Sequence, residues 1–121
     1  PSVITGVWKR GVKACPRPSP AIGIGAPSNL CTHPPQTAST RPLGSVCADP
    51  EGAKLEAELS AAVNMLGIGP QGLGGDATAF AVHVETAATH ITMNPVAVNI
   101  QCHSARRARA TITPGGVEFG F

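Results

Sequence analysis

The stretch LGIGPQGLGGDATA, residues 66–79, decides the order of elements in this chain, because it contains a Gly-x-Gly-x-x-Gly pattern at Gly67, Gly69 and Gly72. Such a pattern cradles a dinucleotide pyrophosphate when it follows a strand and opens a helix. Here the order is reversed, because a helical pattern precedes the glycines and an alternating, strand-like pattern follows them. We therefore interpret the stretch as a turn from a helix to a strand, and not as a nucleotide-binding loop.

The segment before these glycines predicts a helix. Asp49 and Pro50 are typical of an N-cap and a first helical residue, and Gly67 is typical of the position that ends a helix. Apolar residues recur between them at helical spacing, and these residues are Leu55, Leu59, Val63 and Leu66. The charged and polar residues expected to face outward are Lys54, Glu56, Glu58 and Ser60.

Alternation of apolar and polar residues predicts strands on both sides of this helix. Residues 21–25 predict a short buried strand before the helix. Residues 79–85 predict a strand after the glycines, with Phe80, Val82 and Val84 on one face.

The last part of the chain predicts two further β elements. Residues 96–102 alternate, and the side chains that share one face are Val96, Val98, Ile100 and Cys102. Residues 109–119 predict a hairpin, because Pro114-Gly115-Gly116 separates two short alternating runs. The pattern as a whole predicts an α+β, or mixed α/β, fold with one main helix, a small mixed sheet and a terminal hairpin.

Two segments carry weaker patterns. Residues 1–14 predict a short helix end followed by a turn, with Trp8 packed against a neighbour. Residues 26–46 mix prolines with Ser and Thr, a composition that predicts an irregular Pro-rich loop without a regular helix.

Composition limits the size and the class of the protein. The chain has 121 residues, enough for one domain, and only 3% of them are aromatic, so aliphatic side chains must fill its core. The net charge of +2 argues against nucleic acid or a membrane surface as a partner. The chain start carries no targeting signal. We therefore expect residues 1–121 to form a single partial domain, cut from a longer cytoplasmic protein.

Cys102 is the principal candidate for chemistry when the residues alone are considered. It ends a predicted strand beside His103, and Arg106 and Arg107 follow closely. Nearby positive charge favours the thiolate, which is the form that binds a metal or attacks carbon. The alternative is a small, buried cysteine with a packing role.

Two histidines and a basic cluster are further candidates. His90 could bind an anion or act as an acid or base near neutral pH, and its alternative is a loop histidine bonded to the backbone. His83 is expected to face solvent or a neighbouring element. The basic cluster at 106–109 could bind an anion or an acidic partner, or form a solvated edge.

The spacing of the four cysteines argues against two familiar uses. A secreted domain with two disulfides is disfavoured because no secretory segment is present. Zinc sites pair ligands a few residues apart, and only Cys31 and His33 approach that spacing. Thiols that are free or bind a metal in a reducing compartment are therefore favoured.

Three segments resemble the α-subunit of iron–sulfur hydro-lyases, the class I fumarases and L-tartrate dehydratases. They are ACPRPSPAIGIG (14–25), the run from LGIGPQGLGG to VAVNIQCHSARRA (66–108), and RATITPGGVEFGF (109–121). The combination of GPQGLGG with VAVNIQCH is the specific part of this match.

The resemblance implies a [4Fe–4S] cluster that is held by three cysteine thiolates and has one iron open as a Lewis acid. That iron would remove water from, or add it to, a C4 dicarboxylate such as malate or tartrate. On the matching motifs, Cys15 and Cys102 are cluster ligands, and His90 is the histidine that faces the substrate. The implied partner is a β-subunit or C-terminal domain in a hetero- or homo-oligomer.

The chain also departs from the family pattern. The CQDTG segment, which carries the family's first cysteine, and the GSEN segment are absent. Asp76 stands where the family has Lys, and the match that breaks off after Gly25 resumes near Arg41. Three readings are open. The first is part of an active hydro-lyase that holds no stable cluster alone, and the second is a non-catalytic remnant or assembly domain. A generic metal-binding module is the third.

Overall fold

A computed structural model describes residues 2–11, 13, 15–26, 31–102 and 108–120. Helices and strands are mixed along the chain, so the structure confirms the predicted α+β class. The elements in order are α1 (Ser2–Gly11), β1 (Ser19–Gly25), α2 (His33–Thr40), α3 (Pro50–Asn64), the 3₁₀ turn η1 (Pro70–Gly72), β2 (His83–Ala87), β3 (Val96–Gln101), β4 (Arg109–Thr113) and β5 (Gly116–Gly120).

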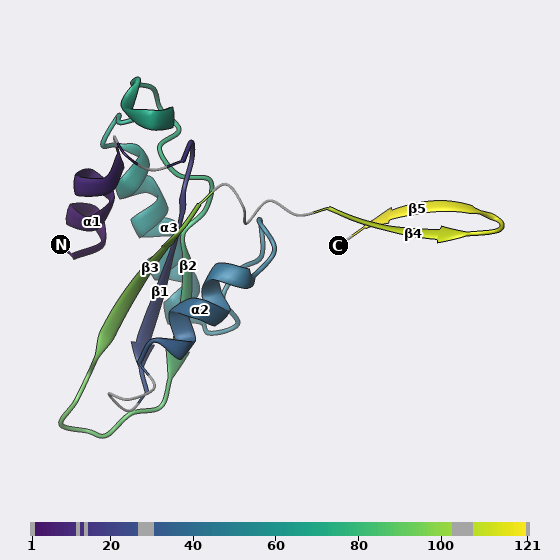
Figure 1. The fold of residues 1–121 in the computed structure, drawn as a ribbon. Coiled ribbons are helices and arrows are strands. Elements are labelled where there is room, and N and C mark those ends of the chain that lie inside the picture. The colour runs from purple at the N-terminus through teal and green to yellow at the C-terminus, as the bar shows by residue number, and fades with distance from the viewer. Residues whose placement is uncertain (1, 12, 14, 27–30, 103–107, 121) are drawn as a thin grey trace.

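The body of the molecule is a three-stranded mixed sheet in the order β2-β1-β3 (Figure 1). β1 pairs with β2 in parallel and with β3 in antiparallel register. In the register, Ile22 of β1 lies opposite Val84 of β2 and Val98 of β3. β1 is therefore the central strand, and six of its seven residues are buried.

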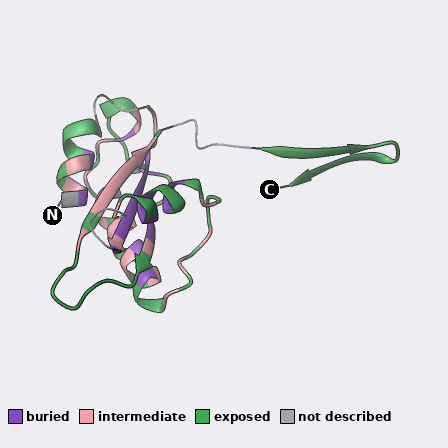
Figure 2. Ribbon diagram, turned by 60° about the horizontal axis from the view of Figure 1, so that its bottom comes forward, coloured by how far each residue is buried: buried purple, intermediate pink, exposed green. Residues whose placement is uncertain are grey.

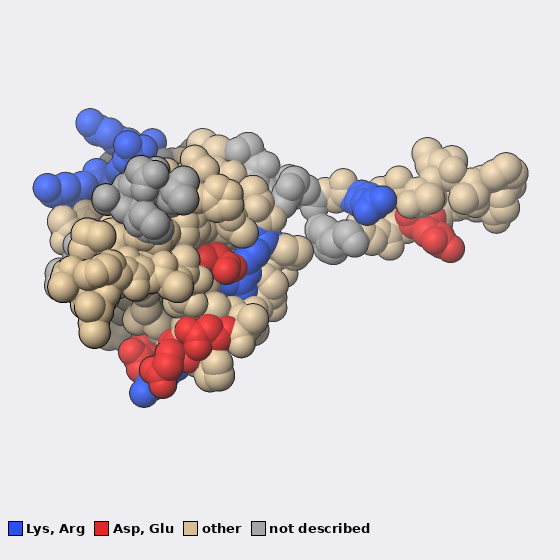
Figure 3. Space-filling view, turned by 90° about the horizontal axis from the view of Figure 1, so that it is seen from below, with Lys and Arg blue, Asp and Glu red and all other residues tan. Residues whose placement is uncertain are grey.

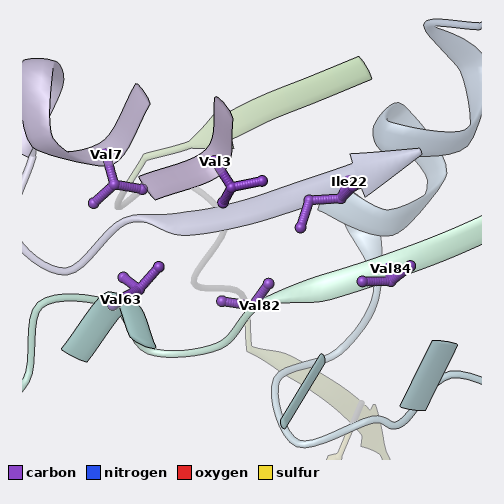
Figure 4. Packing of buried hydrophobic residues seen from close by; sticks show 7 residues of the cluster. Val3, Val7, Ile22, Val63, Val82 and Val84 are labelled. Carbon is purple, nitrogen blue, oxygen red and sulfur yellow. The ribbon is translucent and has the colours of Figure 1, made fainter. Parts of the chain in front are cut away.

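Helices cover both faces of this sheet. α1 and α3 pack on the face that carries Ile22, and seven residues form the buried cluster there (Figure 4): Val3, Val7, Ile22, Val63, Ala79, Val82 and Val84. α2 packs on the opposite face, where a Cβ at Gly23 would collide with Pro34 and Pro35. The core is thus aliphatic, as the composition predicted.

The helix α2 corrects the prediction of an irregular loop at 26–46. Pro34 and Pro35 lie in the first turn of the helix, directly after His33, where a missing N–H costs no intrahelical hydrogen bond. The next proline, Pro42, comes only after the helix has ended at Thr40. The prolines therefore stand at the two ends of a short helix and do not prevent it. Pro34 and Pro35 are buried against β1.

The predicted main helix is confirmed as α3, with one error about its faces. Gly67 has a positive φ of 62°, and its N–H donates to the Asn64 carbonyl, as expected of a helix stop. Glu56, however, was expected to face outward and is only 7% exposed. It lies on the same helical stripe as Gly52, Leu59 and Val63, and ion pairing stabilises it there.

The glycine-rich segment is a closed turn from α3 to β2, as its order predicted. The Ile68 carbonyl accepts from Gly74 N–H at 2.8 Å, and the Asn64 side chain accepts from Thr78 N–H and Ala79 N–H at 2.9 Å. A Cβ at Gly69, where φ is 66°, would collide with the Gly74 carbonyl. The glycines therefore permit a tight crossing of the backbone.

The strand predicted at 79–85 begins later than expected. β2 starts at His83, and Phe80 is 40% exposed, with the Arg17 guanidinium 5.2 Å from its ring centroid. Thr78 and Ala79 bond to the Asn64 side chain rather than to a neighbouring strand, so the sheet ladder cannot extend back to them. Trp8, expected to be packed, is 62% exposed.

The C-terminal hairpin is confirmed and stands apart from the body (Figures 1 and 2). Every residue of β4 and β5 is exposed. Ala110, Ile112, Val117 and Phe119 share one face of the hairpin, because they pair directly across the two strands. No helix in the described part of the chain is long and apolar enough to span a membrane.

Candidate functional site

The sheet topology brings Cys15 and Cys102 to the same end of the molecule. β1 and β3 are antiparallel, and Ser19 at the start of β1 pairs with Gln101 at the end of β3. Cys15 lies just before β1, and Cys102 lies directly after β3. Two cysteines separated by 87 positions in the sequence therefore both lie near the Ser19–Gln101 end of the β1–β3 pair.

Both thiols line a single hollow of about 490 Å³. The end of α1, the segment before β1 and the end of β3 form its walls. The lining residues are Lys9, Arg10, Lys13, Cys15, Pro18, Ile100, Gln101 and Cys102. Both cysteines are exposed, so reagents and ligands can reach them.

The hollow is positively charged. Lys9 and Arg10 belong to the last turn of α1. Lys13 lies in the turn that follows, and its N–H donates to the Arg10 carbonyl at 2.8 Å. No acidic side chain lines it among the described residues. In Figure 3 one group of Lys and Arg side chains lies at the upper left edge of the face, apart from the acidic side chains, while other Lys and Arg side chains lie beside acidic ones. A concave surface lined by one sign of charge attracts counter-ions.

The donor set at the hollow matches part of a cluster site. Thiolates are the usual ligands of iron–sulfur clusters, and two cysteines line this space. Among the described residues, no group of three His, Cys, Asp or Glu side chains lies close enough together to hold a metal ion. The two thiols therefore fit as members of a larger ligand set, and do not complete a site by themselves.

His90 lies at the opposite end of the sheet from the hollow. It follows β2, whose last residue, Ala87, pairs with Gly25 at the end of β1. The seven residues of β1 span about 20 Å, so a distance of that order separates His90 from the two thiols. His90 is exposed, and its Nδ1 lies 2.8 Å from the Thr92 hydroxyl.

The remaining candidates either lie away from the hollow or fall outside the residues that the structure describes. His103, Arg106 and Arg107 are not among the described residues. Cys31 precedes α2, and Cys47 packs with its Sγ against Gly52 of α3, so neither lines the hollow. Asp76 is exposed in the glycine-rich turn and does not line the hollow either.

Sequence reasoning missed a buried ionic network centred on Arg41. Its Nη1 donates to the Glu56 carboxylate at 2.9 Å, to the Val84 carbonyl at 3.1 Å and to the Glu85 carboxylate at 3.1 Å. Glu56 also accepts from Val84 N–H at 2.7 Å and from Cys47 N–H at 2.9 Å. The sequence does contain a signal for the burial of Glu56, because its spacing from Gly52 and Val63 places all three residues on one face of the helix.

His83 lies beside this network and is 2% exposed. Its Nδ1–H donates to the Ala38 carbonyl of α2 at 3.1 Å, since a carbonyl oxygen can only accept. Burial lowers the pKa of His83, and the positive charge of Arg41 lowers it further. The sequence predicted that His83 faces either solvent or a neighbouring element, and the structure shows that it faces the neighbouring element, α2.

Comparison with known proteins supports one family. The family model described as fumarate hydratase (Fumerase) matches residues 2–111. The chain is 41% identical over 106 residues to a Methanocaldococcus jannaschii protein whose name assigns it, provisionally, as L(+)-tartrate dehydratase subunit alpha; this covers 88% of the chain and 37% of the relative.

Two bacterial proteins give similar values. The chain is 40% identical over 105 residues to L(+)-tartrate dehydratase subunit alpha of Escherichia coli strain K12 and to that of Shigella boydii serotype 4, covering 87% of the chain and 35% of each relative. The chain thus spans about a third of the length of the curated relatives that it matches. Because the family model covers nearly all of its residues, the chain belongs to the fumarate hydratase (Fumerase) family.

Proposed function

We propose that this chain is part of the α-subunit of an iron–sulfur hydro-lyase, and that it supplies two of three cluster thiolates. The complete enzyme would add or remove water on a C4 dicarboxylate, either fumarate and malate or tartrate. The observation that carries the proposal is the convergence of Cys15 and Cys102 on one hollow. The family match supports the hydro-lyase class.

In this proposal, Cys15 and Cys102 would hold the cluster, which supplies a Lewis-acidic iron to the departing hydroxyl when bound. The pairing of β1 with β3 along six residue pairs brings the segments that carry the two cysteines to the same end of the sheet. Ile100 and Pro18 contribute apolar walls to the hollow. Apolar walls exclude water and strengthen electrostatic interactions within a site.

The third thiolate, the β-subunit and the remaining substrate-binding groups would come from outside this chain. Relatives carry the name subunit alpha, which implies a further subunit in those proteins. By itself the chain offers two thiols at the hollow, and two ligands do not enclose a cluster. We therefore expect the isolated chain to be inactive and to hold no stable [4Fe–4S] species.

Anaerobic reconstitution with iron and sulfide tests that expectation. The isolated chain should show no persistent cluster absorbance after desalting, with Cys102→Ala as a matched control that should look the same. A stoichiometric, oxygen-sensitive brown species with hydratase activity from these 121 residues would contradict it.

Supplying the missing parts in trans tests the function itself. The chain would be mixed with a separately made segment that carries CQDTG and with a family β-subunit, followed by cluster reconstitution. Hydration of fumarate, or dehydration of tartrate, should appear and should be lost in Cys15→Ala and in Cys102→Ala. Cys31→Ala is the control, because Cys31 lies away from the hollow, and it should retain activity.

A non-catalytic remnant is the second candidate function. The position of His90 favours it, because the structure places this residue at the far end of the sheet from both thiols. Partners that assemble with the chain but restore no hydratase activity would support the remnant. Restored activity that falls in His90→Ala, with the assembly intact, would support the enzyme and would show that assembly brings His90 to a site.

A further inference from the structure

The three cations at the hollow have two competing explanations. Basic residues in the last turn of a helix complement the negative end of its dipole, and Lys9 and Arg10 occupy that turn in α1. Lys13, however, lies beyond the end of the helix and lines the same hollow. All three side chains border one space shared with two thiols, so dipole compensation alone does not explain their grouping.

We propose that Lys9, Arg10 and Lys13 form an anion-binding rim that takes a carboxylate of a small dicarboxylate in this hollow. The volume of about 490 Å³ lies within the range of about 300–1,000 Å³ that is typical of small-molecule sites. The choice of a dicarboxylate as the ligand rests on the proposed function. The presence of a cationic rim rests only on the lining residues.

Charge distribution supports the rim. Acidic residues cluster instead at a second hollow of about 270 Å³, lined in part by Asp49, Glu51 and Glu58. That hollow also contains Ile24 and Thr86, which lie near the other end of the sheet from Ser19. Among the described residues, the first hollow is thus lined by three cations and no acidic residue, whereas the second is lined by three acidic residues and Lys54. A diffusing dianion would be drawn to the hollow that carries the two cysteines.

Isothermal titration calorimetry of the metal-free chain at low ionic strength tests the proposal. L-Malate should bind, and its affinity should fall about tenfold or more in the triple variant Lys9→Gln, Arg10→Gln, Lys13→Gln, since charge-assisted hydrogen bonds are lost. Lys54→Gln, a matched neutralisation on α3, should leave the affinity unchanged within about twofold. Added salt should weaken binding to the parent chain.

Three results of the titration would overturn the proposal. One is equal malate affinity in the parent and the triple variant. Another is equal affinity for lactate, which has the hydroxyl but only one carboxylate. The third is sulfate binding at least as tightly as malate, which would make the rim an inorganic-anion site. Circular dichroism of each variant shows whether the fold is kept; these three side chains are exposed, so we expect it to be kept.

Thiol alkylation gives a second readout at the hollow itself. Iodoacetate carries a negative charge and iodoacetamide carries none, whereas a change in thiol reactivity affects both reagents alike. The rate of alkylation by iodoacetate divided by the rate by iodoacetamide should be several-fold higher at Cys15 and Cys102 than at Cys31. Malate should lower this ratio at Cys15 and Cys102. The triple variant should abolish the difference, and a ratio that is the same at all three cysteines overturns the rim.

Failure of the rim and failure of the proposed function are distinguishable. Rim-dependent malate binding together with an inactive trans assembly would retain the rim and reject the hydro-lyase. An active assembly with an unchanged KM in the triple variant would retain the hydro-lyase and reject the rim.

Discussion

Arg41 joins three separate parts of the chain through one guanidinium. It follows α2, bonds to Glu56 of α3 and bonds to the backbone of Val84 in β2. The Glu56 carboxylate in turn accepts two backbone N–H groups. Buried charges of this kind are stable only when they are paired and hydrogen-bonded. The network therefore ties the end of α2 and the helix α3 to β2.

Replacing Glu56 by Ala should lower the free energy of unfolding by about 3 kcal/mol, because a buried partner of Arg41 and an acceptor for two N–H groups are removed. Urea unfolding followed by circular dichroism measures the change. Glu58→Ala is the control, since Glu58 is exposed on the same helix, and it should change the free energy by less than about 0.5 kcal/mol. Equal effects at the two positions would contradict this role of Glu56.

His83 should make the stability depend on pH. Its pKa is lower in the folded chain than in the unfolded chain, because of burial and then of Arg41. The unfolded chain therefore binds more protons as the pH falls below about 6.5, and stability is lost toward the folded pKa. Above about pH 6.5, the contribution of neutral His83 to the free energy of unfolding is fully present. Unfolding free energies between pH 7.5 and 5.5 should show this fall.

The matched variant for this pH dependence is His83→Gln, which keeps a donor for the Ala38 carbonyl but does not titrate. Its stability should vary less across the same pH range than that of the parent chain. An identical slope in both proteins would assign the pH dependence to other groups.

At the scale of elements, close contact between α2 and β1 depends on a glycine. A side chain at Gly23 would meet Pro34 and Pro35, which lie in the first turn of α2 and are buried on the sheet. Alternation alone predicted the strand but could not show that a helix covers its second face. The rigid turn of prolines and the bare backbone of Gly23 fit each other.

Gly23→Ala should destabilise the chain by about 1–3 kcal/mol, because the added methyl overpacks this contact. Chemical denaturation measures the loss, and hydrogen exchange should show weaker protection in α2 than in α3. Gly6→Ala is the control: it lies in α1 with only Ile100 near its Cβ position, at 3.9 Å, and should be neutral or stabilising. Similar losses at both glycines would contradict the proposed packing.

At the scale of the whole molecule, the hairpin is the least supported part. Ile112 is 80% exposed and Phe119 is 85% exposed, on a face that nothing in the described structure covers. A two-stranded hairpin is at best marginally stable in water by itself. Contact with a partner chain or a second copy would stabilise it.

The isolated chain should therefore associate in a concentration-dependent manner in sedimentation velocity. Ile112→Thr with Phe119→Thr should weaken this association about tenfold, because two exposed apolar side chains are removed from the shared face. Thr111→Ser, on the opposite face of β4, is the control and should have no effect. A chain that sediments as a monomer at every concentration would contradict the prediction.

The sequence by itself determined the α+β class, α3, the glycine turn and the hairpin, because these depend on local periodicity and on the conformations that Gly and Pro permit. It also singled out Cys102, at the end of a predicted strand, and the family resemblance added Cys15 through the ACP motif. Only the tertiary structure decided that these thiols share one hollow, since strand pairing is non-local. Tertiary packing likewise decided that Glu56 is buried, that α2 is a helix, and that His90 lies far from the cysteines.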